Sequence, residues 1–199
     1  MARDVEATKR SLRDAALREF AEHGLHGTTV ERIAMRAKVN KERLYSYFGD
    51  KNALFLSILV EELDKVAAAV PVGVMRPEDF GELAGRTFDY VREHPGLQRL
   101  TLWEGLADTG AVADEADRRV HYREKTVAIE VAQREGLLDD TLDAHHLMFF
   151  LMALASWWFA APQIARMLTD GPIDEDEWAG RRRAVVDAAQ RLAEPRRRL

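Results

Sequence analysis

A run of 15 residues, Leu147 to Ala161, is apolar except for Ser156 and is followed directly by Pro162. It is shorter than the roughly 18 to 20 residues that a helix needs to cross a bilayer, so we expect no membrane contact. A helix predicted at residues 143–168 is apolar on every side in its middle, so its whole surface must be covered. Its own chain can cover one face and a second copy the other. We therefore expect a homodimer in which this helix and the last one, residues 175–193, form a four-helix bundle; the alternative is the core of a monomer.

Helical periodicity continues along the chain, and nothing resembles a ladder of strands. Leu12, Ala16 and Phe20 recur every four residues, which places them on one face of a first helix that Gly24 ends. Further helices are expected at residues 53–69, 78–93, 97–107 and 112–135. The predicted fold class is therefore all-α.

Two short helices are expected directly after the first. Thr28 and Glu31 form a capping box that opens the second helix, and Asn40 is a good N-cap for the third. Only about three or four residues then separate the two helices, which is the spacing of a helix-turn-helix motif. The buried stripe and the corner of this motif are assigned to Val30, Ile33, Ala34, Ala37, Val39 and Leu44.

The third helix presents a polar and aromatic face to the outside. At 100° per residue, Leu44 and Phe48 face the core. The outward face is formed by Glu42, Arg43 and Ser46, with Tyr45 and Tyr47 at its flanks. In helix-turn-helix proteins the first residues of this helix reach base edges in the major groove. Base reading is accordingly predicted for Lys41, Glu42, Arg43 and Tyr45, and phosphate contacts for Thr28, Thr29, Tyr47 and Lys51.

Charge is distributed unevenly along the chain. Residues 1–51 carry 11 Lys and Arg against 8 Asp and Glu, a net charge of +3, whereas the rest carry 18 against 26, a net charge of −8. A basic head on an acidic body suggests that the head meets a polyanion. We therefore predict a DNA-binding domain at residues 1–51 and a helical effector-binding and dimerisation domain at residues 52–199.

The string GTTVERIAMRAKVNKERLYSYFGDKNALF, Gly27 to Phe55, resembles the TetR family of bacterial transcriptional regulators. The specific matches are Phe20-x3-Gly24, Thr28-Thr29-Val30, Ile33-Ala34 and Leu44-Tyr45-x-Tyr47-Phe48-x2-Lys51-x2-Leu54-Phe55. The resemblance covers the first quarter of the chain. It implies DNA reading by Lys41, Glu42, Arg43 and Tyr45, with phosphate contacts from Thr29, Tyr47 and Lys51. It also implies a homodimeric repressor that binds a palindromic operator and is released by a small-molecule effector.

Three positions depart from the family's usual pattern. Lys38 stands where a turn glycine is usual, so either it adopts a positive φ at a cost of about 1 kcal/mol or the turn is altered. Asn40 replaces Ser or Thr, which is a neutral exchange for an N-cap. Glu42 replaces a frequent glycine, so it either reads a cytosine or pairs with Lys38 or Arg43. The operator sequence is therefore left open.

The body carries more aromatic surface than helix packing demands. A pocket lined by aromatic residues and a few polar groups is what a drug-like effector needs. Effector binding is predicted for Trp103, Glu104, His121, Tyr122, Phe149, Met152 and Trp157. Each of these residues also fits a plain role in the core or at a dimer interface.

Two other functions fit parts of the sequence: a DNA-binding protein with a ligand-blind body, acting as a constitutive regulator, and an all-helical enzyme. The second finds little support, because the chain has no cysteine and no Gly-rich phosphate loop. His145 and His146 are adjacent on a helix and are expected to point about 100° apart, so they should not share a metal. The start MARDVEATKR lacks the apolar run of a secretion signal. The sequence thus predicts a cytoplasmic, non-enzymatic regulator without cofactor or metal.

Overall fold

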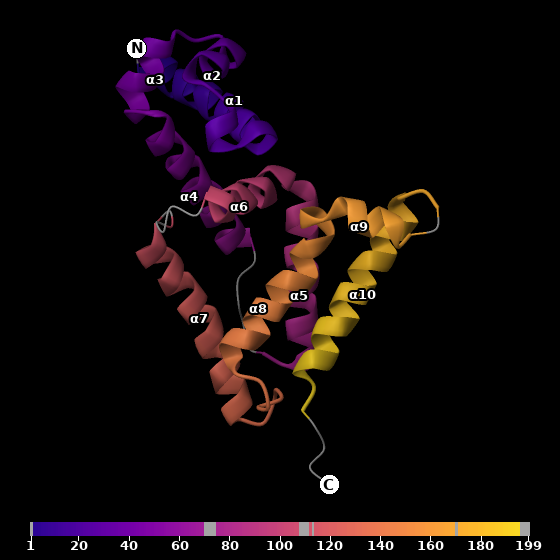
Figure 1. Ribbon diagram of the computed structural model, residues 1–199. Helices are drawn as coiled ribbons and strands as arrows, with labels where there is room; N and C mark the ends of the chain where they lie inside the picture. Colours follow the sequence, from indigo (N-terminus) through magenta and orange to yellow (C-terminus); the bar gives the residue numbers. More distant parts are fainter. Residues whose placement is uncertain (1, 70–74, 108–111, 113, 170, 196–199) are drawn as a thin grey trace. The chain divides into compact units, whose positions relative to one another are not determined.

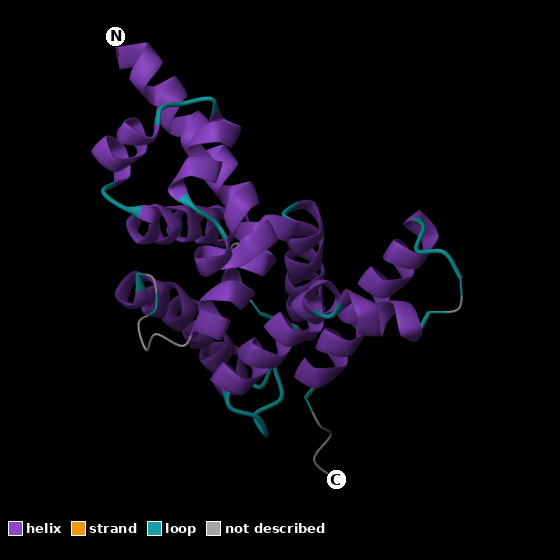
Figure 2. Ribbon diagram, turned by 45° about the horizontal axis from the view of Figure 1, so that its top comes forward, coloured by secondary structure: helices purple, strands orange, loops and turns teal. Residues whose placement is uncertain are grey.

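The computed structural model describes residues 2–69, 75–107, 112, 114–169 and 171–195. Within these ranges the chain forms ten α-helices and no strand, so the predicted all-α class is confirmed. Figures 1 and 2 show how the helices are arranged. None of the described helices is long and apolar enough to cross a membrane. Their bounds are α1 Ala2–Gly27, α2 Val30–Ala37, α3 Lys41–Phe48, α4 Lys51–Ala69, α5 Pro77–Glu93, α6 Pro95–Ala107, α7 Glu115–Arg134, α8 Ala144–Ala160, α9 Pro162–Met167 and α10 Glu175–Ala193.

The chain divides into two compact units. The head unit comprises Met1–Lys65 and Gly96–Glu115, and the body unit comprises Val66–Pro95 and Ala116–Leu199. The packing units therefore do not follow the boundary predicted between residues 51 and 52. Most of α4 and nearly all of α6 pack with the helices of the head, which the pattern of the sequence did not indicate.

The head unit is built on the apolar face of α1. Leu12, Ala16 and Phe20 are fully buried, as predicted, and the Phe20 ring meets the Phe55 ring of α4 edge-on with centroids 5.2 Å apart. Such aromatic pairs contribute about 0.5–1.5 kcal/mol beyond the area they bury. The buried stripe of α2 is also as predicted and consists of Val30, Ile33, Ala34 and Ala37.

Helix α6 packs against the C-terminal part of α1. Gly24 has φ 69° and ψ 177°, so α1 is broken at this residue before its last turn. The Trp103 ring of α6 lies directly over this glycine, and the indole N–H donates to the Ala21 carbonyl at 3.4 Å. Arg99 donates to the same carbonyl. One turn of α1 earlier, Leu17 lies against Gly96.

The body unit is held together mainly by α5, α8 and α10 (Figure 1). Helix α10 approaches α5 closely because α5 carries Gly81 and Gly85 where the two helices meet. A Cβ on Gly81 would lie only 2.9 Å from the Val186 carbonyl oxygen. Phe88 of α5 contacts both Phe159 and Trp178, with centroid separations of 5.1 and 6.0 Å.

A buried arginine ties α8 to α10 within this unit. Arg181 is only 4% exposed, and its guanidinium lies 5.0 Å from the ring centroids of both Trp158 and Trp178. It donates to the Glu177 carboxylate at 2.7 Å and to the Thr169 hydroxyl at 2.8 Å. A desolvated guanidinium between aromatic faces and an acidic partner satisfies its charge without water.

The helix predicted at residues 143–168 is wrong as a single element. Helix α8 ends at Ala160, and α9 begins at Pro162. The proline ring has no N–H for the helix ladder and pushes the preceding residue out of the helical region. Ala161 accordingly has φ −126° and ψ 60°. The apolar run Leu147–Ala161 therefore ends with α8 and its C-cap, and α9 is a separate short helix.

Candidate nucleic-acid interface

The two adjacent threonines before α2 have different roles. Thr29 is the N-cap, because its hydroxyl accepts from the Arg32 N–H at 3.2 Å. Thr28 is 1% exposed, and its hydroxyl donates to the Glu19 carboxylate at 2.7 Å. The predicted capping box of Thr28 with Glu31 is therefore wrong, because the N-cap is Thr29 and Arg32 stands three residues after it. The predicted phosphate contact of Thr28 is also wrong for its side chain, because the hydroxyl is buried and already bonded.

The turn of the motif begins at Lys38, which has φ 56° and ψ 39°. Its N–H donates to the Met35 carbonyl at 3.1 Å, and the Val39 N–H donates to the Ala34 carbonyl at 3.0 Å. These two bonds form a Schellman motif, which ordinarily carries glycine in the left-handed position. The first of the two alternatives for Lys38, a positive φ, is confirmed. The predicted N-cap of α3 is confirmed as well, because the Asn40 side chain accepts from the Glu42 N–H at 3.3 Å.

Replacing Lys38 by glycine is expected to raise the free energy of unfolding by about 0.5–1 kcal/mol, because glycine adopts a positive φ without steric cost. Urea unfolding followed by circular dichroism measures the change. Lys38→Ala is the control, since it removes the charge but keeps the strained backbone, and it should show no such gain. A glycine variant that is less stable than the natural protein would contradict this prediction.

The outward face of α3 is made of exposed polar side chains, as predicted. Lys41, Glu42, Arg43 and Tyr45 are exposed, and Leu44 between them is fully buried. The Arg43 guanidinium reaches the Tyr47 hydroxyl at 3.5 Å. Among the described residues, the Glu42 carboxylate has no ion-pair partner, so the expected pairing with Lys38 or Arg43 does not occur.

Lys41 is paired within the protein rather than free. Its ammonium lies 3.2 Å from the Glu31 carboxylate on α2. The pKa of Glu31 lies below its usual value, first because its own backbone N–H donates to the carboxylate and then because Lys41 does. Both side chains are exposed, so we expect the pair to be weak and to open when a DNA base offers Lys41 a better partner.

Two of the residues predicted to contact phosphates, Thr29 and Lys51, lie near the start of α2. Lys51 donates to the Thr28 carbonyl at 2.8 Å, which ties the start of α4 to the start of α2. An ammonium has three donors, so two remain for a phosphate. Tyr47 is half-buried, with the Lys9 ammonium 5.8 Å from its ring centroid. Thr29 is exposed at the positive end of the α2 dipole.

Comparison with known proteins places this geometry in a family. The model of the tetR family of bacterial regulatory proteins matches residues 12–58, and that of the tetracyclin repressor-like C-terminal domain matches residues 79–191. The HTH-type transcriptional repressor SCO4008 of Streptomyces coelicolor is 38% identical over 194 residues, which cover 97% of this chain and 98% of that protein. The chain belongs to the TetR family of bacterial transcriptional regulators.

Other TetR-like proteins agree along most of the chain. The HTH-type transcriptional regulator RutR of Escherichia coli K12 is 34% identical over 171 residues, covering 81% of this chain and 79% of RutR. The crystal structure of the transcriptional regulator SCO4942 from Streptomyces coelicolor has a TM-score of 0.81 at 31% identity, covering 94% of this chain and 98% of that one. The protein is thus a TetR-family DNA-binding transcriptional regulator, and the match at residues 12–58 contains every predicted DNA-binding residue.

The predicted effector residues of this TetR-family protein are divided between the head unit and the body unit. The expectation is wrong for Trp103, because its ring covers Gly24 in the head unit. Glu104 lies in the same unit and is half-buried. In the body unit, Met152 is half-buried against the core. The other four predicted residues are exposed: His121, Tyr122, Phe149 and Trp157. Side chains on one helix point in several directions, which an aromatic count ignores.

An apolar pocket of about 640 Å³ lies in the body unit between α8, α9 and α10. It is lined by Phe150, Ala153, Leu154, Trp157, Trp158, Ala161, Ile164, Ala165, Leu168 and Leu192. Trp157 alone belongs to the predicted effector residues. Sequence patterns do not predict Ile164 and Leu168 as pocket residues, because they indicate a single helix at residues 143–168. In the structure a separate helix, α9, begins at Pro162. Effector sites usually include convergent polar groups, and this lining offers almost none.

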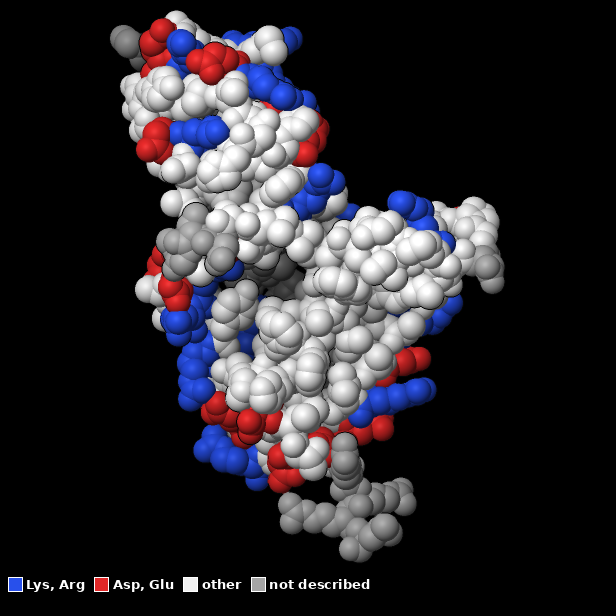
Figure 3. Space-filling model, viewed as in Figure 1, with Lys and Arg blue, Asp and Glu red and all other residues white. Residues whose placement is uncertain are grey.

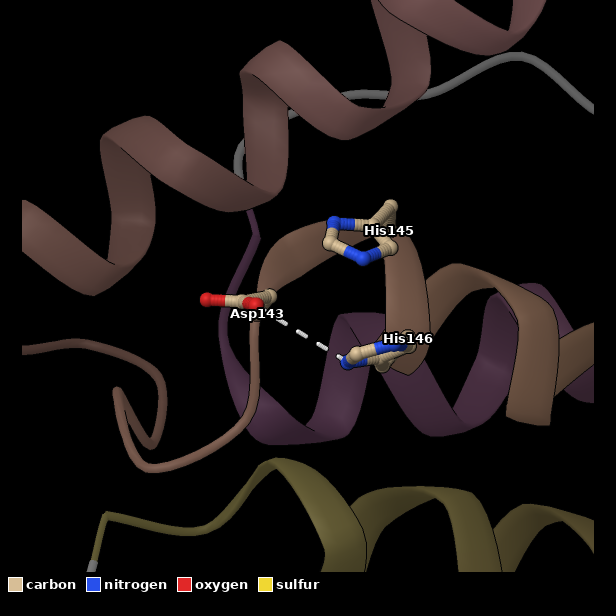
Figure 4. A group of neighbouring side chains, drawn as sticks. All are labelled: Asp143, His145 and His146. Carbon is tan, nitrogen blue, oxygen red and sulfur yellow. Dashed lines mark ion pairs between the residues drawn. The ribbon is translucent and has the colours of Figure 1, made fainter.

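Three potential metal ligands gather at the start of α8 (Figure 4). The rings of His145 and His146 are 4.0 Å apart, and Asp143 lies 3.9 Å from His146, so the expectation that the two rings point apart is wrong. One ligand atom from each residue lies within 4.8 Å of the others, but all three side chains are exposed. The positive end of the helix dipole opposes a cation here. We assign no metal to this cluster.

Proposed function

We propose that the protein is a repressor that binds a palindromic operator as a homodimer and is released by a small-molecule effector. The observation that carries the proposal is the exposed polar face of α3, held by a Schellman turn directly after α2. The repressor names of its relatives, among them SCO4008 and NicS of Pseudomonas putida KT2440, support the direction of regulation.

Each side chain of this face has a matching partner on DNA. The Arg43 guanidinium can donate two hydrogen bonds to a guanine, and the unpaired Glu42 carboxylate can accept one from a cytosine amino group. Lys41 and Tyr45 complete the base-reading set. Phosphates are contacted by Thr29, Tyr47 and Lys51. The hydroxyl of Thr28 is buried and hydrogen-bonds to Glu19 instead.

The homodimer is supported by an apolar surface on the body unit. Phe149 and Trp157 of α8 are 64% and 60% exposed, and Met167 and Leu168, at the end of α9 and just after it, are 75% and 79% exposed. Figure 3 shows a broad uncharged surface over α8, with charged side chains toward its edges. Contiguous exposed apolar surface marks an interaction site. A second copy is the occupant we propose, because two heads about 34 Å apart read a palindrome that one head cannot specify.

Phe149 and Trp157 are accordingly moved from the effector site to the dimer surface in this proposal. His121, Tyr122 and Met152 of the body unit remain the proposed effector contacts, whereas Glu104 belongs to the head unit. An effector that favours one of two head arrangements by about 1–3 kcal/mol changes operator affinity about 5- to 150-fold. An effector that binds both arrangements equally changes nothing.

The test is selection of genomic fragments by the purified protein, followed by affinity measurements on the selected operator. Arg43→Ala is expected to cost about 1–3 kcal/mol on the operator and to relax one base position, because it removes a base contact. Lys51→Ala should weaken all sequences evenly and lower the salt slope by about one.

Arg18→Ala serves as a control, because it removes an exposed positive charge of α1 that has no partner among the described residues. It should leave both the base preference and the operator affinity nearly unchanged. Equal losses on every sequence from Arg43→Ala and Lys51→Ala would contradict the division into base and phosphate contacts. A natural protein that retards no duplex from its own genome, even at low salt, would overturn the proposed function itself.

A further inference from the structure

We propose that Glu19 of α1 is a positioning residue for DNA recognition: its buried carboxylate fixes the orientation of α2 and, through α2, that of α3. The inference rests on the proposed reading of the operator by α3. Glu19 is only 3% exposed. A buried carboxylate must be paired and hydrogen-bonded, and its partners among the described residues lie on α1, on α2 or, for Thr28, between them.

The partners on the side of α2 recur every four residues. One carboxylate oxygen of Glu19 accepts from the Thr28 hydroxyl at 2.7 Å and lies 3.1 Å from Nε of Arg32. The other oxygen lies 2.9 Å from Nε of Arg36. Thr28, just before α2, and Arg32 and Arg36 on α2 therefore face the same carboxylate of α1. Arg36 also pairs with the exposed Glu22 of α1 at 3.1 Å. His23 lies at the edge of this group, 4.0 Å from the carboxylate.

Directional bonds matter here because the apolar contact of α2 is small. Its buried stripe contains only Val30 and Ile33 as larger side chains, next to two alanines. Apolar burial is non-directional, so such a short stripe leaves rotation of the helix weakly defined. Two contacts from α2 and one from Thr28 just before it, all to one carboxylate, remove that freedom. Buried ion pairs add little net stability but can specify one arrangement.

The orientation of α2 passes directly to α3. The turn between them is short and is held by the Schellman bonds at Lys38. On the opposite flank of α2, Glu31 pairs with Lys41 at the first turn of α3. Leu44 is the one residue of α3 that is fully buried. Helix α3 therefore takes its direction largely from α2, and α2 takes its direction from Glu19.

The test compares Glu19→Gln with the natural full-length protein, on the operator and on random duplex, well below the melting temperature of either. The amide keeps the size of the side chain and an acceptor for Thr28, but it removes the charge that both arginines face. We expect operator affinity to fall about tenfold while affinity for random DNA stays level or rises, so the specificity ratio falls. Glu19→Asp, which keeps the charge, should restore part of the ratio.

Leu59→Val is the matched control, because Leu59 is fully buried in the same unit on α4 and its loss affects stability alone. It should lower the melting temperature and leave the specificity ratio unchanged. If Glu19→Gln also melts lower but keeps the natural ratio, Glu19 is only structural and the inference fails. That outcome is distinct from failure of the proposed function, in which the natural protein binds no duplex.

Arg32→Gln and Arg36→Gln keep the inference testable if Glu19→Gln does not fold, because both side chains are partly exposed. Each should lower the specificity ratio without changing the salt slope. If the arginines instead contact phosphates, each variant will weaken operator and random DNA alike and lower the slope by about one. That result would overturn the positioning role.

Discussion

Replacing Gly24 by alanine is expected to lower the free energy of unfolding of the head unit by about 3 kcal/mol or more. Two costs add at this position. The backbone has φ 69° and ψ 177°, a region that only glycine adopts readily. The added Cβ would also lie 2.7 Å from Cδ2 of Trp103, closer than real Cβ contacts, and a packed indole cannot move away without leaving α1.

Gly49→Ala separates these two costs. Gly49 has φ 83° and nothing within 4 Å of the Cβ position, so alanine there is strained without a clash. Urea unfolding of the natural protein and the two variants should therefore give Gly24→Ala a much lower free energy of unfolding than Gly49→Ala. Trp103→Ala introduced into the Gly24→Ala variant should recover part of the difference, because it removes the clash. If both glycine variants lose the same stability, α6 is not packed on α1 as described.

Replacing Trp157 by glutamate is expected to convert the dimer to a monomer and to weaken operator binding by about 100-fold or more. The ring is 60% exposed in the single chain, so the change should not unfold the monomer. In the proposed dimer the same position is buried, and an unpaired carboxylate there is costly. Two heads that are no longer linked must each bind alone, which removes the advantage of a shared scaffold.

Sedimentation equilibrium gives the mass of the Trp157→Glu variant, circular dichroism shows whether it is folded, and gel retardation with the selected palindrome measures its affinity. Val120→Glu is the matched control, because Val120 of α7 is also exposed, at 55%, but lies off the proposed dimer surface. It should remain dimeric. A dimeric Trp157→Glu protein would show that this face has another occupant.

Sequence patterns predicted the elements whose cause is local. The buried stripe of α2 and the Asn40 cap of α3 depend on residues within one turn, and both are confirmed. The positive φ of Lys38 was one of two stated alternatives for the same reason. The assignment of Thr28 and Thr29 failed because either hydroxyl can cap a helix. The choice is made by Glu19, a side chain of another helix.

Predictions for the body were weaker because they require contacts between distant segments. Its aromatic character favours an effector site for Trp103, but the ring packs on Gly24. No periodicity in the sequence indicates this contact. The break at Pro162 had a local signal, yet its effect on exposure depends on how α9 lies against α8 and α10. Which exposed aromatic residues a second copy covers is likewise a property of the assembly.

The pairing of Lys41 with Glu31 bears on how the regulator searches a chromosome. Random DNA offers phosphates but no matching bases, and on it Lys41 has little reason to leave its internal counterion. Each encounter with a wrong sequence therefore displaces fewer cations from the duplex, and we expect short dwell times there. Lys41 leaves Glu31 only at a matching operator. The carboxylate of Glu31 can therefore shorten the time that the regulator needs to find its operator.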